Sequence, residues 1–256
     1  MRLLDALLPF ALLAPLLAAQ APTAAALPAL LTRVRAIRDA TDFRASGRLV
    51  SVPAPGQRKS YQLSLRARSF AGVLKIFCAI TDPAPARVRL LLESHPSGAS
   101  AIRLGHAGDP APRELPFERW ADSILATDFA YEDLMESQFL WRNQSLVEET
   151  TYGARHCSVL RSTPGPADRT HYSAVTTWLD QATGYPVKVE KTVRLSGIVK
   201  EFIYYGLRQS KGVWSASQIE CRIKGQPGSS LLIISRGSEK ASLAAREFDP
   251  ALLIRP

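Results

Sequence analysis

The sequence contains few of the residues, and none of the motifs, that mark a metal site or a secreted hydrolase. Its 256 residues include three cysteines and four histidines, and no two histidines stand four residues apart. There is no CxxC pair, no HExxH, no GxSxG and no SxxK followed by KTG. Those patterns supply the metal ligands or the activated nucleophile of common secreted enzymes. We therefore expect no enzyme, no metal and no cofactor, and a secreted hydrolase is the least favoured class.

The three cysteines, Cys78, Cys157 and Cys221, lie far apart in segments with strand-like patterns. In an exported protein one pair could form a disulfide and leave a third thiol. Three separate buried thiols fit the same spacing equally well, because free cysteine packs as a small apolar residue. The sequence does not decide between these two states.

The first 26 residues have the pattern of a secretory signal peptide. They begin with Arg2, continue through a leucine-rich run and end in small residues, with cleavage fitting after Ala21 or after Ala26. The apolar run is interrupted by an acid and two prolines and is shorter than the roughly 20 residues of a membrane span, so anchoring is less favoured. We expect export, with residues 27–256 forming one domain, because no linker or repeat divides them.

The chain is basic, with a formal net charge of +9 that the removal of residues 1–26 does not change, because Arg2 and Asp5 cancel. Export argues against nucleic acid as the partner. The excess of cations suits anionic headgroups, an acidic protein partner or solubility alone.

Hydrophobic periodicity predicts one basic helix followed by many strands. Apolar residues from Leu27 to Ile37 have helical spacing, with Pro28 in the first turn. From Asp42 the period changes to two, and residues 61–67 alternate between apolar and polar. Further strands are predicted at 73–80, 87–93, 99–104, 145–151, 155–162, 170–179, 185–195, 198–205, 213–223 and 229–237.

Between two groups of strands lies a segment with helical spacing. Phe117, Trp120, Ile124 and Leu125 form one apolar stripe, which predicts an amphipathic helix over 117–125, and a second short helix is predicted over 129–135. Within 127–135, Asp128, Glu132 and Asp133 lack the pattern of a calcium loop. We expect Thr127 or Asp128 to cap the second helix and the two other acids to lie in its first turns.

About eleven strands with short connections predict a mainly β fold with helices, of the α+β class. The expected architecture is a single curved, unclosed antiparallel half-barrel with amphipathic helices covering its concave face. Such a helix could fill the sheet's open face or act as a movable cover over a cavity.

Residues 127–134, TDFAYEDL, resemble the TDFSYEDL block of the LolA-like outer-membrane lipoprotein-sorting proteins. The similarity continues through Trp178-Leu179-Asp180, Tyr185 to Glu190, Gly197, Lys200-Glu201-Phe202, Gly212-Val213-Trp214, Ile219-Glu220 and Phe248 to Leu253. Two departures are Ser215-Ala216, where proline is usual, and Cys221, where methionine is common.

The resemblance implies a periplasmic carrier whose apolar cavity accepts acyl chains of lipoproteins or other lipids, in lipoprotein sorting or lipid transport. It also implies an inner-membrane exporter and an outer-membrane receptor as partners, no nucleic acid, and a monomer. The alternative to a carrier is a periplasmic envelope-stress sensor or protein-binding module that has the same fold.

Strand alternation provides candidate residues for the cavity lining: Tyr61, Leu63, Leu65, Tyr172, Trp178, Val187 and Val189. Tyr172 and Trp178 are predicted on one face because an even separation preserves the face of a strand. The candidate lid residues are Phe117, Trp120, Ile124, Leu125, Phe129, Tyr131 and Leu134.

Overall fold

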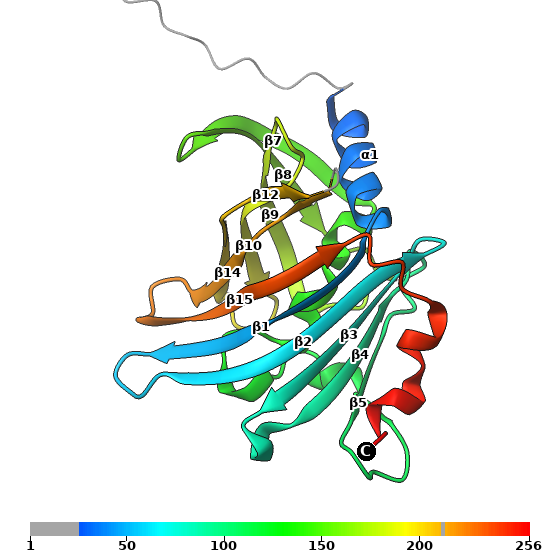
Figure 1. Ribbon diagram of the computed structural model, residues 1–256. Helices are drawn as coiled ribbons and strands as arrows, with labels where there is room; N and C mark the ends of the chain where they lie inside the picture. Colours follow the sequence, from blue (N-terminus) through cyan, green and yellow to red (C-terminus); the bar gives the residue numbers. More distant parts are fainter. Residues whose placement is uncertain (1–25, 211–212) are drawn as a thin grey trace, which may run out of the picture.

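The computed structural model describes residues 26–210 and 213–256 (Figure 1). Within these residues the chain forms one α-helix, fifteen strands and seven 3₁₀ helices. The predicted signal peptide, except for Ala26, lies outside them. None of the described helices has the length and apolar character needed to span a bilayer.

The elements follow one another along the chain with short connections. The helix is α1 (Ala26–Asp39). The strands are β1 (Asp42–Pro53), β2 (Lys59–Phe70), β3 (Val73–Asp82), β4 (Val88–Ser94), β5 (Ala101–Gly105), β6 (Arg113–Glu114), β7 (Asn143–Tyr152), β8 (Arg155–Thr163), β9 (Tyr172–Asp180), β10 (Pro186–Val193), β11 (Val199–Tyr205), β12 (Arg208–Ser210), β13 (Val213–Ser215), β14 (Gln218–Ile223) and β15 (Gly228–Glu239). The 3₁₀ helices are η1 (Ala84–Ala86), η2 (Phe117–Arg119), η3 (Ile124–Ala126), η4 (Tyr131–Met135), η5 (Ser137–Leu140), η6 (Ala245–Phe248) and η7 (Pro250–Leu253).

Thirteen strands form one antiparallel sheet in the order β6-β5-β4-β3-β2-β1-β15-β14-β11-β10-β9-β8-β7. The long pairing of β1 with β15 joins the N-terminal meander to the C-terminal one. Strands β6 and β7 stand at the two ends of this order, so the sheet is curved but not closed (Figure 1). The predicted open half-barrel is therefore confirmed. The sheet has thirteen strands instead of about eleven because β1 and the two-residue β6 are additional to the predicted ranges.

Both faces of β3 and β4 are covered, which explains why several consecutive residues of each strand are apolar, at 76–80 and 90–92. Ile76, Cys78 and Ile80 face the main apolar cluster on the concave side. Phe77 and Leu91 pack on the other face against the C-terminal segment that includes Phe248 and Leu253. That segment runs beside β3, β4 and β5 in Figure 1. Leu90, Leu91 and Leu92 are consequently all fully buried.

Helix α1 confirms the predicted basic amphipathic helix and lies against the β7–β9 end of the sheet (Figure 1). Val34 is buried in a small cluster with Phe139, Leu160 and Leu179. On its polar face, Arg33 donates from Nη1 to the carbonyl oxygen of Gln181 at 2.7 Å. The helix is therefore attached to the sheet through both of its faces.

The predicted amphipathic helix over 117–125 is wrong, whereas the short helix predicted over 129–135 is present as the 3₁₀ helix η4. The segment forms the short 3₁₀ helices η2, η3 and η4, separated by extended residues and by an antiparallel bridge between Ser123 and Ala130. Leu125 and Ala126 have positive φ angles of 52° and 56°, which no continuous right-handed helix allows. A 3₁₀ turn places residues i and i+3 on one side, so its apolar spacing is close to that of an α-helix.

All three cysteines are free and buried, which decides between the two states that the sequence allowed. Burial raises the pKa of the Cys78 thiol to about 12 and that of Cys221 well above its usual value. A rise of this size lowers the thiolate fraction at neutral pH by about a thousandfold, and the thiolate is the reactive form.

We therefore expect Ellman's reagent to modify the native protein very slowly and to detect three thiols after unfolding in denaturant. Prior reduction should leave this number unchanged. A single thiol in the unreduced, unfolded protein would show instead that two of the cysteines form a disulfide.

Candidate functional site

An apolar cavity of about 230 Å³ lies on the concave side of the sheet, between α1, the central strands and the 129–139 segment. Its apolar lining comes from residues far apart in the sequence. They are Val34, Ile37, Phe43, Ala45, Leu65, Ala67, Leu74, Ile76, Phe129, Leu134, Phe139, Phe202, Trp214, Ile219, Leu232 and Ile234. The cavity lies at the α1 end of the sheet, because β1, β3 and β14 contribute residues near their starts and β2 and β11 contribute residues from their later parts.

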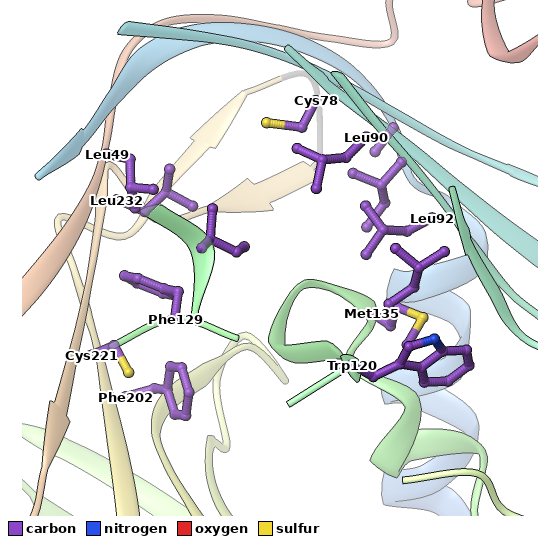
Figure 2. Packing of buried hydrophobic residues seen from close by; sticks show 14 of the residues in the cluster. Leu49, Cys78, Leu90, Leu92, Trp120, Phe129, Met135, Phe202, Cys221 and Leu232 are labelled. Carbon is purple, nitrogen blue, oxygen red and sulfur yellow. The ribbon is translucent and has the colours of Figure 1, made fainter. Parts of the chain in front are cut away.

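A second, smaller hollow of about 30 Å³ continues along the concave face toward β4. Leu65, Phe129, Leu134 and Leu232 border both spaces. Figure 2 shows Phe129 between Leu232 and Phe202, and its ring meets that of Phe202 edge-on at 5.9 Å between centroids. Phe129 and Leu134, from the TDFAYEDL segment, therefore separate two parts of one apolar surface.

Asp133 fastens this segment to the sheet. Its carboxylate, 1% exposed, forms ion pairs with Lys191 on β10 at 3.1 Å and with Lys200 on β11. The Tyr172 hydroxyl donates to Oδ1 at 2.5 Å, and the Ala130 N–H donates to Oδ2 at 2.8 Å. Although burial alone raises the pKa of a carboxyl, Lys200 and Lys191 hold the pKa of Asp133 well below its usual range. Asp133 is thus a buried anion whose charge is compensated on two strands.

The neighbouring carboxyl, Glu132, is held differently. Its oxygens accept from the hydroxyl of Thr170 at 3.1 Å and from the N–H of His171 at 3.2 Å. Burial, followed by the nearby charge of Asp133, raises the pKa of Glu132 above its usual value. The two adjacent acids therefore have opposite pKa shifts, because Asp133 lies beside two lysines and Glu132 does not.

The prediction that Glu132 and Asp133 lie in the first turn of the second helix is confirmed, and the Asp133 side chain accepts from the N–H of Ala130, which precedes η4. Thr127 and Asp128 do not cap this helix. The Thr127 hydroxyl donates to the Ile124 carbonyl at 2.7 Å, and Asp128 accepts from the Ser230 hydroxyl on β15 at 2.7 Å. Asp128 thus adds a third attachment of the segment to the sheet.

One side of the large cavity is polar. Arg38, buried on α1, donates to the Gly72 carbonyl at 2.9 Å and to the Ser94 carbonyl at 3.0 Å. Glu136 accepts from the Tyr204 hydroxyl at 3.1 Å, and burial together with this carboxylate raises the pKa of Tyr204 well above its usual value. All of Arg38, Glu136 and Tyr204 border the cavity. An amphipathic molecule therefore finds both an apolar wall and hydrogen-bonding groups.

Of the predicted lining residues, Leu65 borders the large cavity and Leu63 borders the small hollow. Tyr61 packs against the main cluster, with its hydroxyl 3.4 Å from the Leu125 carbonyl oxygen. Val189 and Tyr172 are buried in that cluster without bordering either space. Val187 is buried, is the extra residue of a β-bulge in β10, and also borders neither.

The prediction that Tyr172 and Trp178 share a face is wrong. Tyr172 pairs with Val193 and Ala174 pairs with Thr192, so Ser173 is an extra residue at this point of β9. A β-bulge of this kind reverses the alternation beyond it. Trp178 consequently lies outside the main cluster, with the Nζ of Lys188 4.5 Å from its ring centroid.

The predicted lid residues do gather on the concave face. Trp120, Ile124 and Phe129 are buried in the main cluster, and Phe117, Leu125, Tyr131 and Leu134 pack against it. Figure 2 shows Trp120 beside Met135, with Leu92 above them. Only Phe129 and Leu134 of this set border the large cavity. Whether these residues act as a lid stays a prediction.

Several lining residues are additional to those predicted, notably Leu74, Ile76, Phe202, Tyr204, Leu232 and Ile234. They come in pairs two residues apart on β3, β11 and β15, which is the alternation of a strand with one face on the cavity. This signal is present in the sequence, but it does not show which end of each strand lies beside α1.

A family model described as "uncharacterized protein" matches residues 111–255, which is more than half of the chain. The chain belongs to this family. No curated protein matches the sequence.

Solved structures show the fold. A domain from Vibrio parahaemolyticus, provisionally named an outer membrane lipoprotein-sorting protein domain, is 20% identical with a TM-score of 0.77, over 87% of this chain and 96% of that one. A DUF1329 family protein from Desulfovibrio piger is 16% identical with a TM-score of 0.80, over 90% and 98%. A LolA superfamily protein from Nitrosomonas europaea is 17% identical with a TM-score of 0.67, over 88% and 98%. This family member thus has the LolA-like fold, as the TDFAYEDL block predicted.

Proposed function

We propose that this LolA-like chain is a periplasmic carrier that binds the acyl chains of lipoproteins or other lipids in its apolar cavity. The observation that carries the proposal is the cavity of about 230 Å³ on the concave face, whose lining is mostly aliphatic and aromatic with one polar side. A structural neighbour named for lipoprotein sorting supports it. In this proposal residues 1–26 are removed on export and residues 27–256 act as one domain.

The binding energy would come from burial alone. Each methylene moved from water to an apolar site contributes about 0.8 kcal/mol, so ten methylenes contribute about 8 kcal/mol before the cost of ordering the chain. The cavity of about 230 Å³ is smaller than the roughly 300–1,000 Å³ of most ligand sites. A long acyl chain therefore requires Phe129 and Leu134 to move aside, which is the lid role that we propose for this segment.

No covalent step is part of this function, so we propose a binding protein and not an enzyme. Release then depends on a partner that offers comparable apolar burial. An inner-membrane exporter that loads the carrier and an outer-membrane receptor that unloads it would meet this need, and the carrier would act as a monomer.

Native mass spectrometry of the protein purified from the periplasm tests the proposal most directly. We expect a mature chain that begins near residue 22 or 27 and carries a bound lipid, which extraction then identifies. A lipid-free chain, together with no saturable binding of any acylated ligand, would contradict the carrier function.

Filling the cavity should weaken acyl binding. Leu65 borders both spaces, so Leu65→Trp should lower the affinity for an environment-sensitive fluorescent fatty acid by about tenfold or more. Saturation titrations followed by fluorescence measure this affinity, and circular dichroism verifies that the variant is folded.

Gln62→Ala is the matched control, because Gln62 is exposed on the opposite face of the same strand. We expect its affinity to equal that of the unmodified chain. Equal losses in the two variants would show that the fatty acid binds elsewhere.

A further inference from the structure

Three neighbouring turns at one end of the sheet combine positive charge with exposed apolar side chains. They are residues 194–198 between β10 and β11, 224–227 between β14 and β15, and 54–58 between β1 and β2, here named the turn cluster. The turns are adjacent because Lys200 pairs with Ile223 and Pro53 pairs with Gly228. In Figure 1 the β14–β15 and β1–β2 turns lie side by side at the left.

The β10–β11 turn presents apolar side chains to solvent. Leu195 is 94% exposed, which makes it the most exposed large apolar side chain of the described residues, and Ile198 in the same turn is 39% exposed. Single exposed apolar residues are common on protein surfaces. Two of them in one five-residue turn, beside cationic turns, form a more specific pattern.

The charges of the turn cluster all have one sign. Arg194, Lys224 and Arg58 supply one cation to each turn, Lys59 follows directly, and the three turns contain no Asp or Glu. Arg58 and Lys59 are exposed, and the Lys224 side chain is 60% exposed although its Nζ lies 3.3 Å from Glu190. Arg58, Lys59 and Lys224 are therefore available to a partner, whereas Arg194 donates to the Tyr172 carbonyl at 3.4 Å.

We propose that the turn cluster docks the protein on an anionic bilayer surface, with Leu195 and Ile198 entering the interface between headgroups and acyl chains. Cations near such a surface are attracted to its headgroups, and apolar side chains gain by burial among the acyl chains. A lipid surface is a better partner for the turn cluster than an acidic protein is. An exposed leucine on a projecting turn can be buried among acyl chains, whereas a protein partner would have to provide a complementary pocket. The turn cluster borders neither cavity, so this inference goes beyond the acyl-binding function.

Co-sedimentation of the mature chain with vesicles tests the proposal. We expect binding to vesicles that contain phosphatidylglycerol, little binding to phosphatidylcholine alone, and weaker binding as salt shortens the range of charge attraction. Leu195→Asp should weaken binding more than tenfold, and Arg58→Ala by about fivefold.

Two matched controls use the same substitutions elsewhere. Val147→Asp changes an apolar residue that is 51% exposed on the edge strand β7, and Arg161→Ala removes an exposed cation from β8. Both variants should bind the phosphatidylglycerol vesicles as strongly as the unmodified chain does. Equal losses of vesicle binding in the test and control variants would show that binding depends only on net charge or general hydrophobicity, and would overturn the proposal.

Two further outcomes would also overturn it. One is the absence of binding to either vesicle. The other is retention on a polyaspartate matrix without vesicle binding, which would assign the cations to an acidic protein. Fatty-acid binding by the Leu195→Asp and Arg58→Ala variants should be unchanged, so failure of the docking proposal and failure of the carrier proposal are distinguishable.

Discussion

Replacing Asp133 by asparagine should lower the free energy of unfolding by about 3–5 kcal/mol at neutral pH. The substitution keeps the shape of the side chain but removes the anion that Lys191 and Lys200 face in a buried site. Removal of one partner from a buried ion pair leaves the other charges uncompensated. Urea denaturation followed by circular dichroism measures the change.

The contribution of Asp133 to the free energy of unfolding should decrease as the pH falls. The pKa of Asp133 is lower in the folded chain than in the unfolded one, so its stabilisation is complete above the unfolded pKa and is lost as the pH falls through the folded pKa. The unmodified chain should therefore lose stability in acid more steeply than Asp133→Asn. Parallel pH profiles of the two proteins would show that Asp133 is not ionised in the folded state.

Glu132→Gln is the matched control one residue away. The pKa of Glu132 is raised on folding, so the stability contribution of this group is present below its unfolded pKa and lost as the pH rises through its folded pKa. Glutamine still offers an oxygen to Thr170 and His171, and its amide can donate to the His171 Nδ1, which lies 3.4 Å from the Glu132 Oε1. We expect the free energy of unfolding at neutral pH to stay equal or to rise by about 1 kcal/mol. A loss as large as that of Asp133→Asn would refute the distinction between the two acids.

Phe129→Ala should have opposite effects on stability and on acyl binding. Phe129 is 3% exposed in the main cluster, and its truncation should cost about 3–5 kcal/mol of unfolding free energy. The same truncation joins the large cavity to the small hollow, which Phe129 separates. Affinity for a long-chain fluorescent fatty acid should therefore increase several-fold, by titration, while stability falls.

Phe248→Ala provides the comparison. Phe248 is 1% exposed in the cluster on the other face of the sheet, so its loss should destabilise the fold by a similar amount without changing either cavity. Its fatty-acid affinity should equal that of the unmodified chain. If both phenylalanine variants lose affinity in proportion to their stability, Phe129 is ordinary core and the lid proposal is wrong.

Much of the fold could be predicted from local patterns. The alternation over residues 61–67 became β2, and the helical spacing from Leu27 to Ile37 became α1. Both patterns arise because backbone geometry fixes which side chains share a face. The open, curved sheet followed from the number of strands and the shortness of their connections.

The candidate site was predicted less completely. Leu65 and Phe129 were identified, since each is apolar at a position whose periodicity points inward. The face of the sheet on which Trp178 lies was not predicted correctly, because one additional residue, Ser173, reverses the alternation of β9. A bulge depends on the register with the neighbouring strand, and no pattern within β9 reveals that register.

The sequence by itself determined that Phe117, Trp120, Ile124 and Leu125 would pack on one apolar surface, because apolar residues at helical spacing avoid water together. Only the tertiary structure decided that they form separate 3₁₀ turns, held by attachments to distant strands. Asp133 meets lysines 58 and 67 residues away. Spacing along a chain reports which side chains avoid water, whereas the pairing of buried charges depends on how the sheet curves and brings β10 and β11 beneath the segment.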